Sequence, residues 1–475
     1  MDEYNEQNIV EDEPVTDTTG IDPVGGQNKC PKCGATDISL NPNNGLLRCN
    51  FCRHEFEPEK AADEEPDVSK LEGTIIGSGA QDIVADTADV ITLKCSSCGA
   101  EVVIDSAQAT QARCHWCRNT LSLQQQIPNG AVPDVVLPFK IKREEAKNNI
   151  AKFVSKRRFY AHPQFKREFN AENVMGVYLP YMVVDINAHS TLVGQGEHEV
   201  RRYTVGTGKD KETYYDADLY DVEREFDILV EGLTVESSAD KLDNKTSQKT
   251  NNIINSIMPF DTENNVKWNA NYLKGFTSEK RDTNVQQLQG LVKVQAKDIA
   301  RHKTNETLKD YNRGVCWSKE DMTVKGERWK AAYLPVWLYS YYQKSKNVLH
   351  YVAVNARTKE TMGSVPINKP KLFAVSAIIE TISFLIWLVI WPFLRSSNSD
   401  GDTDYSWALL TLGFIYYAWI YAKYRNKGAR HYHEKETKAT VNNMRKQDTF
   451  VEQRTRLKSS KMSGANNTSV KGSSF

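Results

Sequence analysis

The sequence lacks an excess of either charge, and it has few cysteines and few long apolar runs. Its 475 residues include 61 basic and 61 acidic side chains, so the formal net charge is zero. A chain this balanced has no overall positive field for a polyanion, which excludes a basic nucleic-acid coat protein. Only nine residues are cysteine. The length is that of about two to four domains.

Catalytic motifs are also missing. Gly206-Thr207-Gly208-Lys209 resembles the end of a phosphate-binding loop, but the Walker pattern needs Gly where Tyr203 stands and Ser or Thr where Asp210 stands. His198-Glu199 is not followed by a second His at the zinc-protease spacing, and no partner His can be identified for the isolated Cys316. We therefore expect that the protein is not an enzyme and has no catalytic residues.

Long apolar runs occur at two places, residues 372–394 and 405–422. Each is long enough to cross a hydrocarbon core of about 30 Å as a helix. Lysines precede the first run and basic residues follow the second, so the positive-inside rule puts both termini in the cytoplasm. We predict a hairpin of two spans in the cell membrane, with the short polar stretch 395–404 on the outer side.

Glu380 lies inside the first apolar run. A charged carboxylate at the centre of a bilayer costs at least about 2.5 kcal/mol, so an acid at this depth is a candidate functional residue. Two helices alone cannot enclose a transport path. We therefore interpret Glu380 as a protonated side chain that is hydrogen-bonded to Thr381, to Tyr416 or to a second copy of the hairpin.

Eight of the nine cysteines form two copies of one pattern, C-x2-C-x15-C-x2-C. Each C-x2-C turn places two thiols on one side of a tight knuckle, and two facing knuckles complete a tetrahedral cage of four sulfurs. We predict one structural Zn2+ in each copy. An iron site or two disulfides per copy would use the same cysteines, but we expect a reducing cytoplasmic compartment. The predicted ligands are Cys30, Cys33, Cys49 and Cys52 in the first copy, and Cys95, Cys98, Cys114 and Cys117 in the second.

Short β-rich stretches join the knuckles, so each copy is expected to be a small zinc ribbon that folds only with its metal. The predicted ribbons are residues 29–60 and 94–123, and we expect them to be separate beads joined by a solvated linker at 61–93. Gly34 and Gly99 directly follow the first knuckles, where a positive φ is expected.

Residues 132–368 have a globular composition and several β-rich segments, which predicts an α+β unit with antiparallel sheets. The unit contains a weak repeat. Leu137-Pro138-Phe139 is echoed by Met258-Pro259-Phe260, and Tyr178-Leu179-Pro180 by Tyr333-Leu334-Pro335. The two offsets differ, so we expect a duplicated module with an insertion, and we assign the insertion to a helix at 282–302. The predicted fold class is multidomain: two zinc ribbons, a duplicated α+β domain and a transmembrane hairpin.

The two ends of the chain have opposite charge. Residues 1–28 carry eight acidic side chains and no basic one, whereas residues 423–475 carry thirteen basic and four acidic side chains. Both segments are predicted to be disordered. Because the basic tail would leave the membrane on the cytoplasmic side, we expect it to contact anionic lipid.

The stretch KCPKCGATDISLNPNNGLLRCNFCRHEF resembles the transcription-factor-IIB-type zinc ribbon at the front of a group of bacterial membrane proteins, which are often misnamed as primosomal or helicase proteins. In that group Gly usually ends the second knuckle, where this chain has Arg53 and Arg118. The order of ribbon, central strands and hairpin extends the resemblance over residues 29–425. It implies partners among membrane-associated stress and scaffold proteins.

We expect a membrane-anchored scaffold that recruits other proteins to the cytoplasmic face. A membrane-tethered nucleic-acid binder is the alternative, because this type of ribbon occurs in transcription factors. Ribbon 29–60 carries five basic and four acidic residues, which is no positive footprint for phosphates. The aromatic residues at the knuckle tips, Phe51 and Trp116, suit a protein partner better. The oligomeric state stays open.

Overall fold

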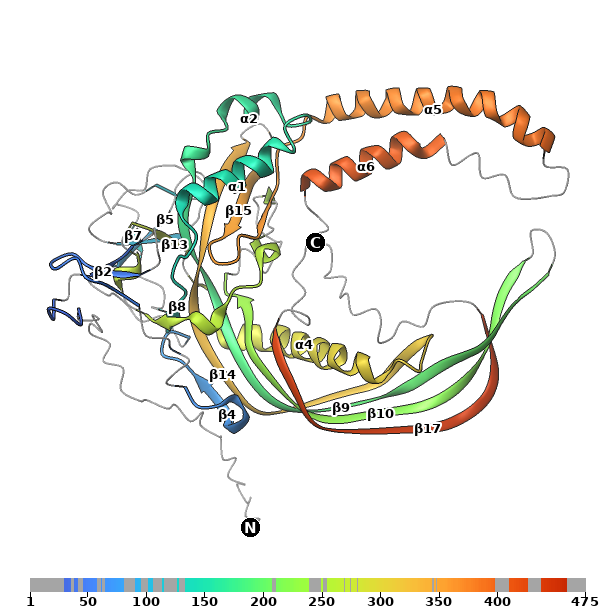
Figure 1. Ribbon diagram of the computed structural model, residues 1–475, viewed down its shortest axis with the longest axis horizontal. Helices are drawn as coiled ribbons and strands as arrows, with labels where there is room; N and C mark the ends of the chain where they lie inside the picture. Colours follow the sequence, from blue (N-terminus) through green and yellow to red (C-terminus); the bar gives the residue numbers. More distant parts are fainter. Residues whose placement is uncertain are drawn as a thin grey trace, which may run out of the picture.

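The protein is described from a computed structural model. It describes residues 30–458, apart from 81–89, 95–100, 106–112, 115–125, 128–132, 239–248, 398–409, 426–436 and several gaps of up to four residues. The chain forms a small three-stranded sheet, one large curled mixed sheet and a pair of apolar helices that project from the compact end (Figure 1).

Four long strands make up most of the large sheet. They are β9 (Met175–Val205), β10 (Glu212–Glu236), β14 (Gly314–Gln343) and β17 (Lys438–Lys458), and they run antiparallel in the order β17, β10, β9, β14. Figure 1 shows them curving along the length of the molecule. Burial along β10 alternates residue by residue, as expected for a strand with one covered face. The predicted antiparallel pairing holds for these long strands, but the sheet as a whole is mixed, because short strands such as β8 and β13 pair in parallel with β14 and β9.

Two parts of the central region share one order of elements. The first is β8 (Val135–Val136), α1 (Arg143–Ser155), β9 and β10, and the second is β13 (Thr277–Glu279), α4 (Val285–Thr304), β14 and β15 (Val348–Asn355). The short strand of each part pairs in parallel with the long strand of the other. The helix predicted as an insertion at 282–302 is therefore α4, the counterpart of α1, and that prediction was wrong.

The compact end of the sheet is covered on both faces. Even-numbered residues of β9, such as Tyr178 and Val184, lie in the apolar cores that include α1 and α4. Odd-numbered residues, such as Leu179, lie in a separate core with the segment Ile257–Phe260. Because successive side chains of a strand alternate between faces, this pattern fixes the register of β9 against its neighbours.

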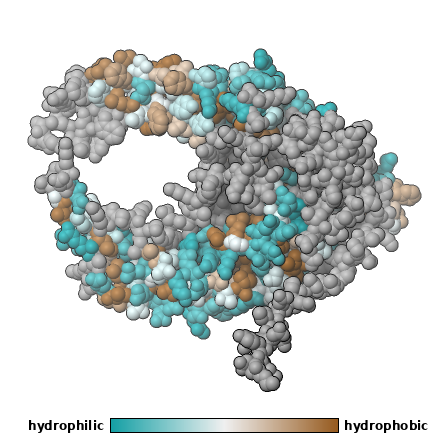
Figure 2. All heavy atoms as spheres, turned by 180° about the vertical axis from the view of Figure 1, so that it is seen from behind, coloured by the Kyte–Doolittle hydropathy of each residue, from teal (hydrophilic) through white to brown (hydrophobic). Residues whose placement is uncertain are grey.

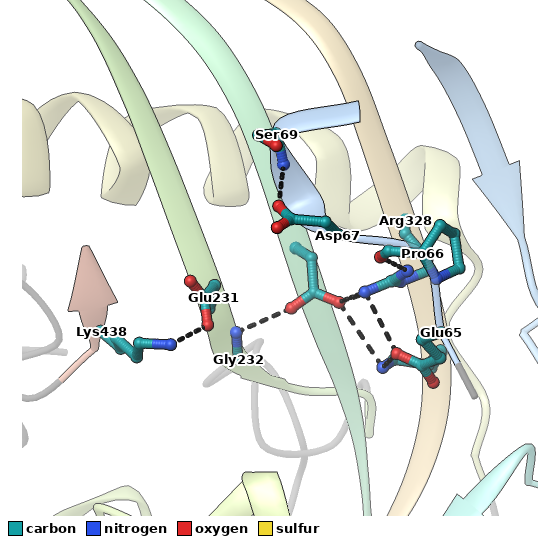
Figure 3. A network of polar contacts seen from close by, with 10 residues as sticks. Glu65, Pro66, Asp67, Ser69, Glu231, Gly232, Arg328 and Lys438 are labelled. Carbon is teal, nitrogen blue, oxygen red and sulfur yellow. Dashed lines mark hydrogen bonds and ion pairs between the residues drawn. The ribbon is translucent and has the colours of Figure 1, made fainter. Parts of the chain in front are cut away.

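The segment predicted to be a linker is partly docked on the sheet. Strand β4 (Gly73–Ile76) runs parallel to β14, and a β-carbon on Gly326 would lie 2.2 Å from the carbonyl oxygen of Leu71. Arg328 Nη2 lies 2.8 Å from Asp185 and 3.1 Å from Glu65 (Figure 3). The solvated-linker prediction was therefore wrong for these residues, because β4 pairs with β14 and Glu65 has two basic partners on that strand, Arg328 and Lys330.

The two ribbons are not separate beads either. Ile38 of the first ribbon belongs to the same buried core as Phe139 and Tyr272 of the central region. In the second, strands β5 (Val90–Lys94) and β6 (Glu101–Asp105) form a hairpin that joins the large sheet through β13. The prediction missed these contacts because they lie far apart in sequence.

The basic C-terminal tail is not disordered throughout. Residues Lys438–Lys458 form β17, which pairs with β10 along most of its length. The fully buried guanidinium of Arg224 contacts Asp448, and Lys438 contacts Glu231. The composition of the tail predicted disorder because it does not reveal these acidic and basic partners across the strands. Residues 1–29 and 459–475 lie outside the described part of the chain.

Candidate metal centre and apolar helices

Four of the predicted zinc ligands come together between β1 (Ile38–Leu40), β2 (Leu47–Cys49) and β3 (Glu55–Phe56). The sulfur atoms of Cys30, Cys33, Cys49 and Cys52 all lie within 4.8 Å of one another. Cys30 and Cys52 are 3.5 Å apart, and Cys33 and Cys49 are 3.6 Å apart. A tetrahedral zinc with bonds of about 2.3 Å separates its sulfurs by about 3.8 Å, so the cluster is compatible with a metal site.

The two knuckles of this cluster have the same backbone structure. The N–H of Gly34 donates to the carbonyl of Cys30, and the N–H of Arg53 donates to that of Cys49, at 2.8 and 2.9 Å. Gly34 has a φ of 71° and Arg53 a φ of 60°. Arg53 therefore adopts the left-handed conformation that glycine adopts in the first knuckle, at a cost of about 1–2 kcal/mol.

The cluster favours a thiolate at Cys30 and a protonated thiol at Cys33, where the backbone N–H of Ala35 lowers the pKa but burial and the thiols of Cys52, Cys49 and Cys30 outweigh it and raise the pKa to about 12. Burial raises the pKa of the Cys30 thiol, but the backbone N–H groups of Cys33 and Lys32 and the thiol of Cys52 outweigh burial and lower the pKa to about 7. The thiolate is the form that binds metal. The N–H of Cys52 also points at the sulfur of Cys49, 3.5 Å away.

The second predicted ligand set is described only at one position. Cys114 is buried, in the same core as Ala61 and Leu137. Cys95, Cys98 and Cys117 lie outside the described residues, as does Trp116. A second zinc ion therefore stays a prediction from the spacing.

Within the part of the chain that is described, one helix is long and apolar enough to cross a membrane. It is Lys369–Ile390 of α5 (Lys369–Ser397), in which an 18-residue window has a mean hydropathy of 2.3 and is only 11% buried. Helix α6 (Leu412–Arg425) packs beside α5 but has 14 residues. The first residues of the predicted second span, 405–409, are outside the described part. Figure 2 shows apolar residues along the arc that the two helices form.

Glu380 has a partner that the sequence did not suggest. Its carboxylate accepts a hydrogen bond of 2.7 Å from the backbone N–H of Gly413, in the first turn of α6. The positive end of a helix dipole favours a carboxylate at this position. A β-carbon on Gly413 would lie 2.5 Å from the carbonyl oxygen of Ser376, so only glycine permits this close approach. Among the proposed partners, Thr381 instead donates to the carbonyl of Ala377.

The base of the hairpin is fixed to the folded part by a turn after α1. The hydroxyl of Tyr160 lies 2.8 Å from that of Tyr416, and its backbone N–H donates to the hydroxyl of Tyr424. Beside it, Arg157 donates to the carbonyls of Phe153 and Lys423. The sequence analysis did not identify this turn, because no local pattern marks it.

No family model, no curated protein and no solved structure matches the chain. The resemblance to the bacterial membrane proteins therefore stays a prediction from the cysteine motif and the order of segments.

Proposed function

We propose that the protein is a non-enzymatic, membrane-anchored zinc-ribbon protein that holds its folded part at the cytoplasmic face as a docking scaffold for other proteins. The observation that carries this proposal is topological. Strands β15 and β17 belong to one sheet, although α5 and α6 lie between them in the chain. A chain that leaves one sheet and returns to it begins and ends on one side of a membrane, which is compatible with the proposed hairpin of two spans.

The exposed side chains of the hairpin support insertion in a bilayer. At 1.5 Å per residue, the 22 residues Lys369–Ile390 extend about 33 Å, which matches a hydrocarbon core of about 30 Å. Apolar patches of this extent on a monomer mark an interaction surface. The exposed apolar side chains include Phe373, Ile378, Ile382, Phe384, Leu385, Leu388, Val389, Phe414, Ile415 and Trp419.

The charge at the base of the hairpin supports a cytoplasmic orientation. Lys369 and Lys371 begin α5, Lys423 and Arg425 end α6, and the Tyr160 turn contacts this same end. Under the positive-inside rule the folded part lies in the cytoplasm. That compartment is reducing, so the thiols of the ribbons stay available for zinc.

The metal sites are proposed to be structural. Four thiolates fill the tetrahedral shell of Zn2+ and leave no open position for a substrate. The first cluster would hold one ion and the second, Cys95, Cys98, Cys114 and Cys117, another. At the tip of the first ribbon, Phe51 is 81% exposed. A fixed, exposed aromatic side chain is a typical anchor for a protein partner.

Topology labelling tests the anchor. Single cysteines would be introduced at Asp402, in the predicted outer loop, and at Lys152, on the exposed face of α1. A membrane-impermeant thiol reagent added to intact cells is expected to label the first and not the second. Labelling of Lys152→Cys, or recovery of the unmodified chain in the soluble fraction, would contradict the proposal.

A second experiment tests the scaffold role. Proteins that co-purify with the detergent-solubilised full chain would be compared between wild type, Phe51→Ser and the control Val294→Ser, an exposed residue on α4. A partner lost only with Phe51→Ser supports docking at the ribbon tip. Binding of DNA or RNA at physiological salt instead of a protein would favour the alternative of a nucleic-acid binder.

A further inference from the structure

A cluster of positive charge surrounds an exposed aromatic ring where α5 leaves the folded part. The side chain of Phe159 is 60% exposed. Its backbone carbonyl accepts hydrogen bonds from two ammonium groups, Lys371 at 3.1 Å and Lys166 at 3.3 Å. The ammonium of Lys371 also lies 3.8 Å from the centre of the Phe159 ring.

The positive charge of this cluster is not neutralised within the described residues. Two ammonium groups share one neutral carbonyl oxygen, and Arg158 is adjacent in sequence. No carboxylate of the described chain forms an ion pair with Lys166, Lys371 or Arg158. Burial lowers the pKa of Lys166, and the positive charges of Lys371 and Arg158 lower it further.

The position of the cluster relative to the proposed bilayer indicates which ligand it would bind. Lys371 lies in the first turn of α5, just before the apolar segment that is proposed to enter the bilayer. Side chains at this level of a membrane helix meet the phosphates of lipid headgroups. An ammonium has three donors, so Lys166 and Lys371 each keep two for an acceptor other than the Phe159 carbonyl.

We propose that Lys166, Lys371 and Arg158 bind the headgroup phosphate of an anionic phospholipid, while the ring of Phe159 inserts beside its acyl chains. This inference rests on the proposed insertion of the hairpin. It moves the predicted lipid contact from the basic tail to the base of α5, because β17 places Lys438–Lys458 in the sheet. A free phosphate ion would use the cations but would gain nothing from Phe159.

Native mass spectrometry of the full chain released from lipid nanodiscs tests the site. The nanodiscs contain phosphatidylcholine alone or with a minority of phosphatidylglycerol. We expect the wild type to retain phosphatidylglycerol and the double variant Lys166→Gln/Lys371→Gln to retain it about thirtyfold more weakly, since each basic residue near an anionic surface contributes about 1 kcal/mol, or about fivefold. The control is Lys293→Gln/Lys309→Gln, which removes two exposed lysines elsewhere.

Two further variants separate charge, insertion and folding. Lys166→Arg/Lys371→Arg keeps both charges and is expected to retain the lipid, whereas Phe159→Ser is expected to weaken retention with all cations in place. Equal retention by wild type and Lys166→Gln/Lys371→Gln would overturn the lipid site alone, since the chain would still have entered the nanodisc. Failure of the wild type to enter nanodiscs would overturn the proposed anchor. Competition by inorganic phosphate with no effect of Phe159→Ser would overturn the assignment to a lipid.

Discussion

Arg224 and Asp448 lie 224 residues apart in sequence and form a two-bond ion pair between β10 and β17. The guanidinium is fully buried and also donates to the hydroxyl and the carbonyl of Thr307, just after α4. The pair therefore joins β10, which comes before the apolar helices in the chain, to β17, which follows them, and to the segment just after α4. The hairpin is in this sense an insertion into a single folded unit.

Removing the acidic partner should release β17. Asp448→Ala leaves a buried, unpaired guanidinium, and we expect a cost of about 2 kcal/mol, less than for a fully buried pair because the Asp448 side chain is 37% exposed. The rate of limited proteolysis within β17 should rise about thirtyfold, because these residues are cleaved only when the strand leaves β10. Glu452→Gln, on an exposed side chain of β17, should leave the rate unchanged. Equal rates for both variants would show that the pair does not fix the strand.

The metal centre should depend on each cysteine of the cluster. Cys49→Ser removes one of four thiolates, and we expect the purified chain to contain about one zinc ion fewer than the wild type, because a structural site and its fold form together. Cys316→Ser removes an exposed thiol outside both patterns and is the matched control. Metal content is measured by mass spectrometry of the metal. An unchanged zinc content in Cys49→Ser would contradict the predicted ligand set.

The knuckle residues with positive φ should respond in opposite directions. Arg53→Gly removes the strain of a left-handed arginine and should stabilise the ribbon by about 1 kcal/mol. Gly34→Ala should destabilise it by a similar amount, and this change is purely conformational because a β-carbon there would meet nothing within 4 Å. The chelator concentration that removes half the zinc measures both effects. Equal shifts of the same sign would mean that the two knuckles are not equivalent.

Local patterns predicted the site better than the fold. The spacing of the cysteines was enough to predict that Cys30, Cys33, Cys49 and Cys52 form one cluster, since each knuckle is formed by neighbours in sequence. The length of the first apolar run was enough to predict α5. The pairing of β17 with β10 depends on partners such as Arg224 and Asp448, which no local pattern connects.

The internal repeat shows the same limit. The two Tyr-Leu-Pro segments pair with each other, with Leu179 directly opposite Leu334. The Pro-Phe segments do not occupy equivalent places, because Pro138 follows β8 whereas Pro259 precedes β12 (Val266–Lys267). The Tyr-Leu-Pro similarity reflects the repeat, whereas the Pro-Phe similarity is a coincidence. The two pairs of segments are therefore separated by different numbers of residues, and this difference led to the wrong assignment of α4 as an insertion.

Acid should weaken the curled sheet at a defined point. The ammonium of Lys325 and the ring of His189 lie 2.6 and 3.0 Å from Asp227 and lower the pKa of this carboxyl to about 2. Since this pKa lies below the ordinary value of 3.8, the carboxylate stabilises the fold above about pH 4, and this contribution is lost as the pH falls towards 2. Asp227→Asn should lower the midpoint of thermal unfolding near neutral pH, and the difference from wild type should shrink below about pH 4. A difference that does not depend on pH would show that the carboxylate charge is not responsible.

The contact between Gly413 and α5 should decide whether the hairpin closes. Gly413→Leu places a side chain where a β-carbon already lies 2.5 Å from the carbonyl oxygen of Ser376, so we expect the helices to separate at a cost of about 1–3 kcal/mol. Ala418→Leu adds the same bulk at an exposed position of α6 and is the control. The amount of chain in the membrane fraction and its melting temperature in detergent measure the effect.

Two variants of Glu380 distinguish a structural role of its contact with Gly413 from a functional one. Glu380→Gln keeps an oxygen that accepts the N–H of Gly413, so we expect membrane level and thermal stability close to wild type. Glu380→Leu removes the acceptor and, under the proposed insertion in a bilayer, leaves that N–H unpaired at a cost of several kcal/mol, so the amount of chain in the membrane should fall. If Glu380→Gln kept its membrane level and oligomeric state but lost the binding of a partner, the carboxyl group itself would be required. Glu380 would then act in function as well as in the contact with Gly413.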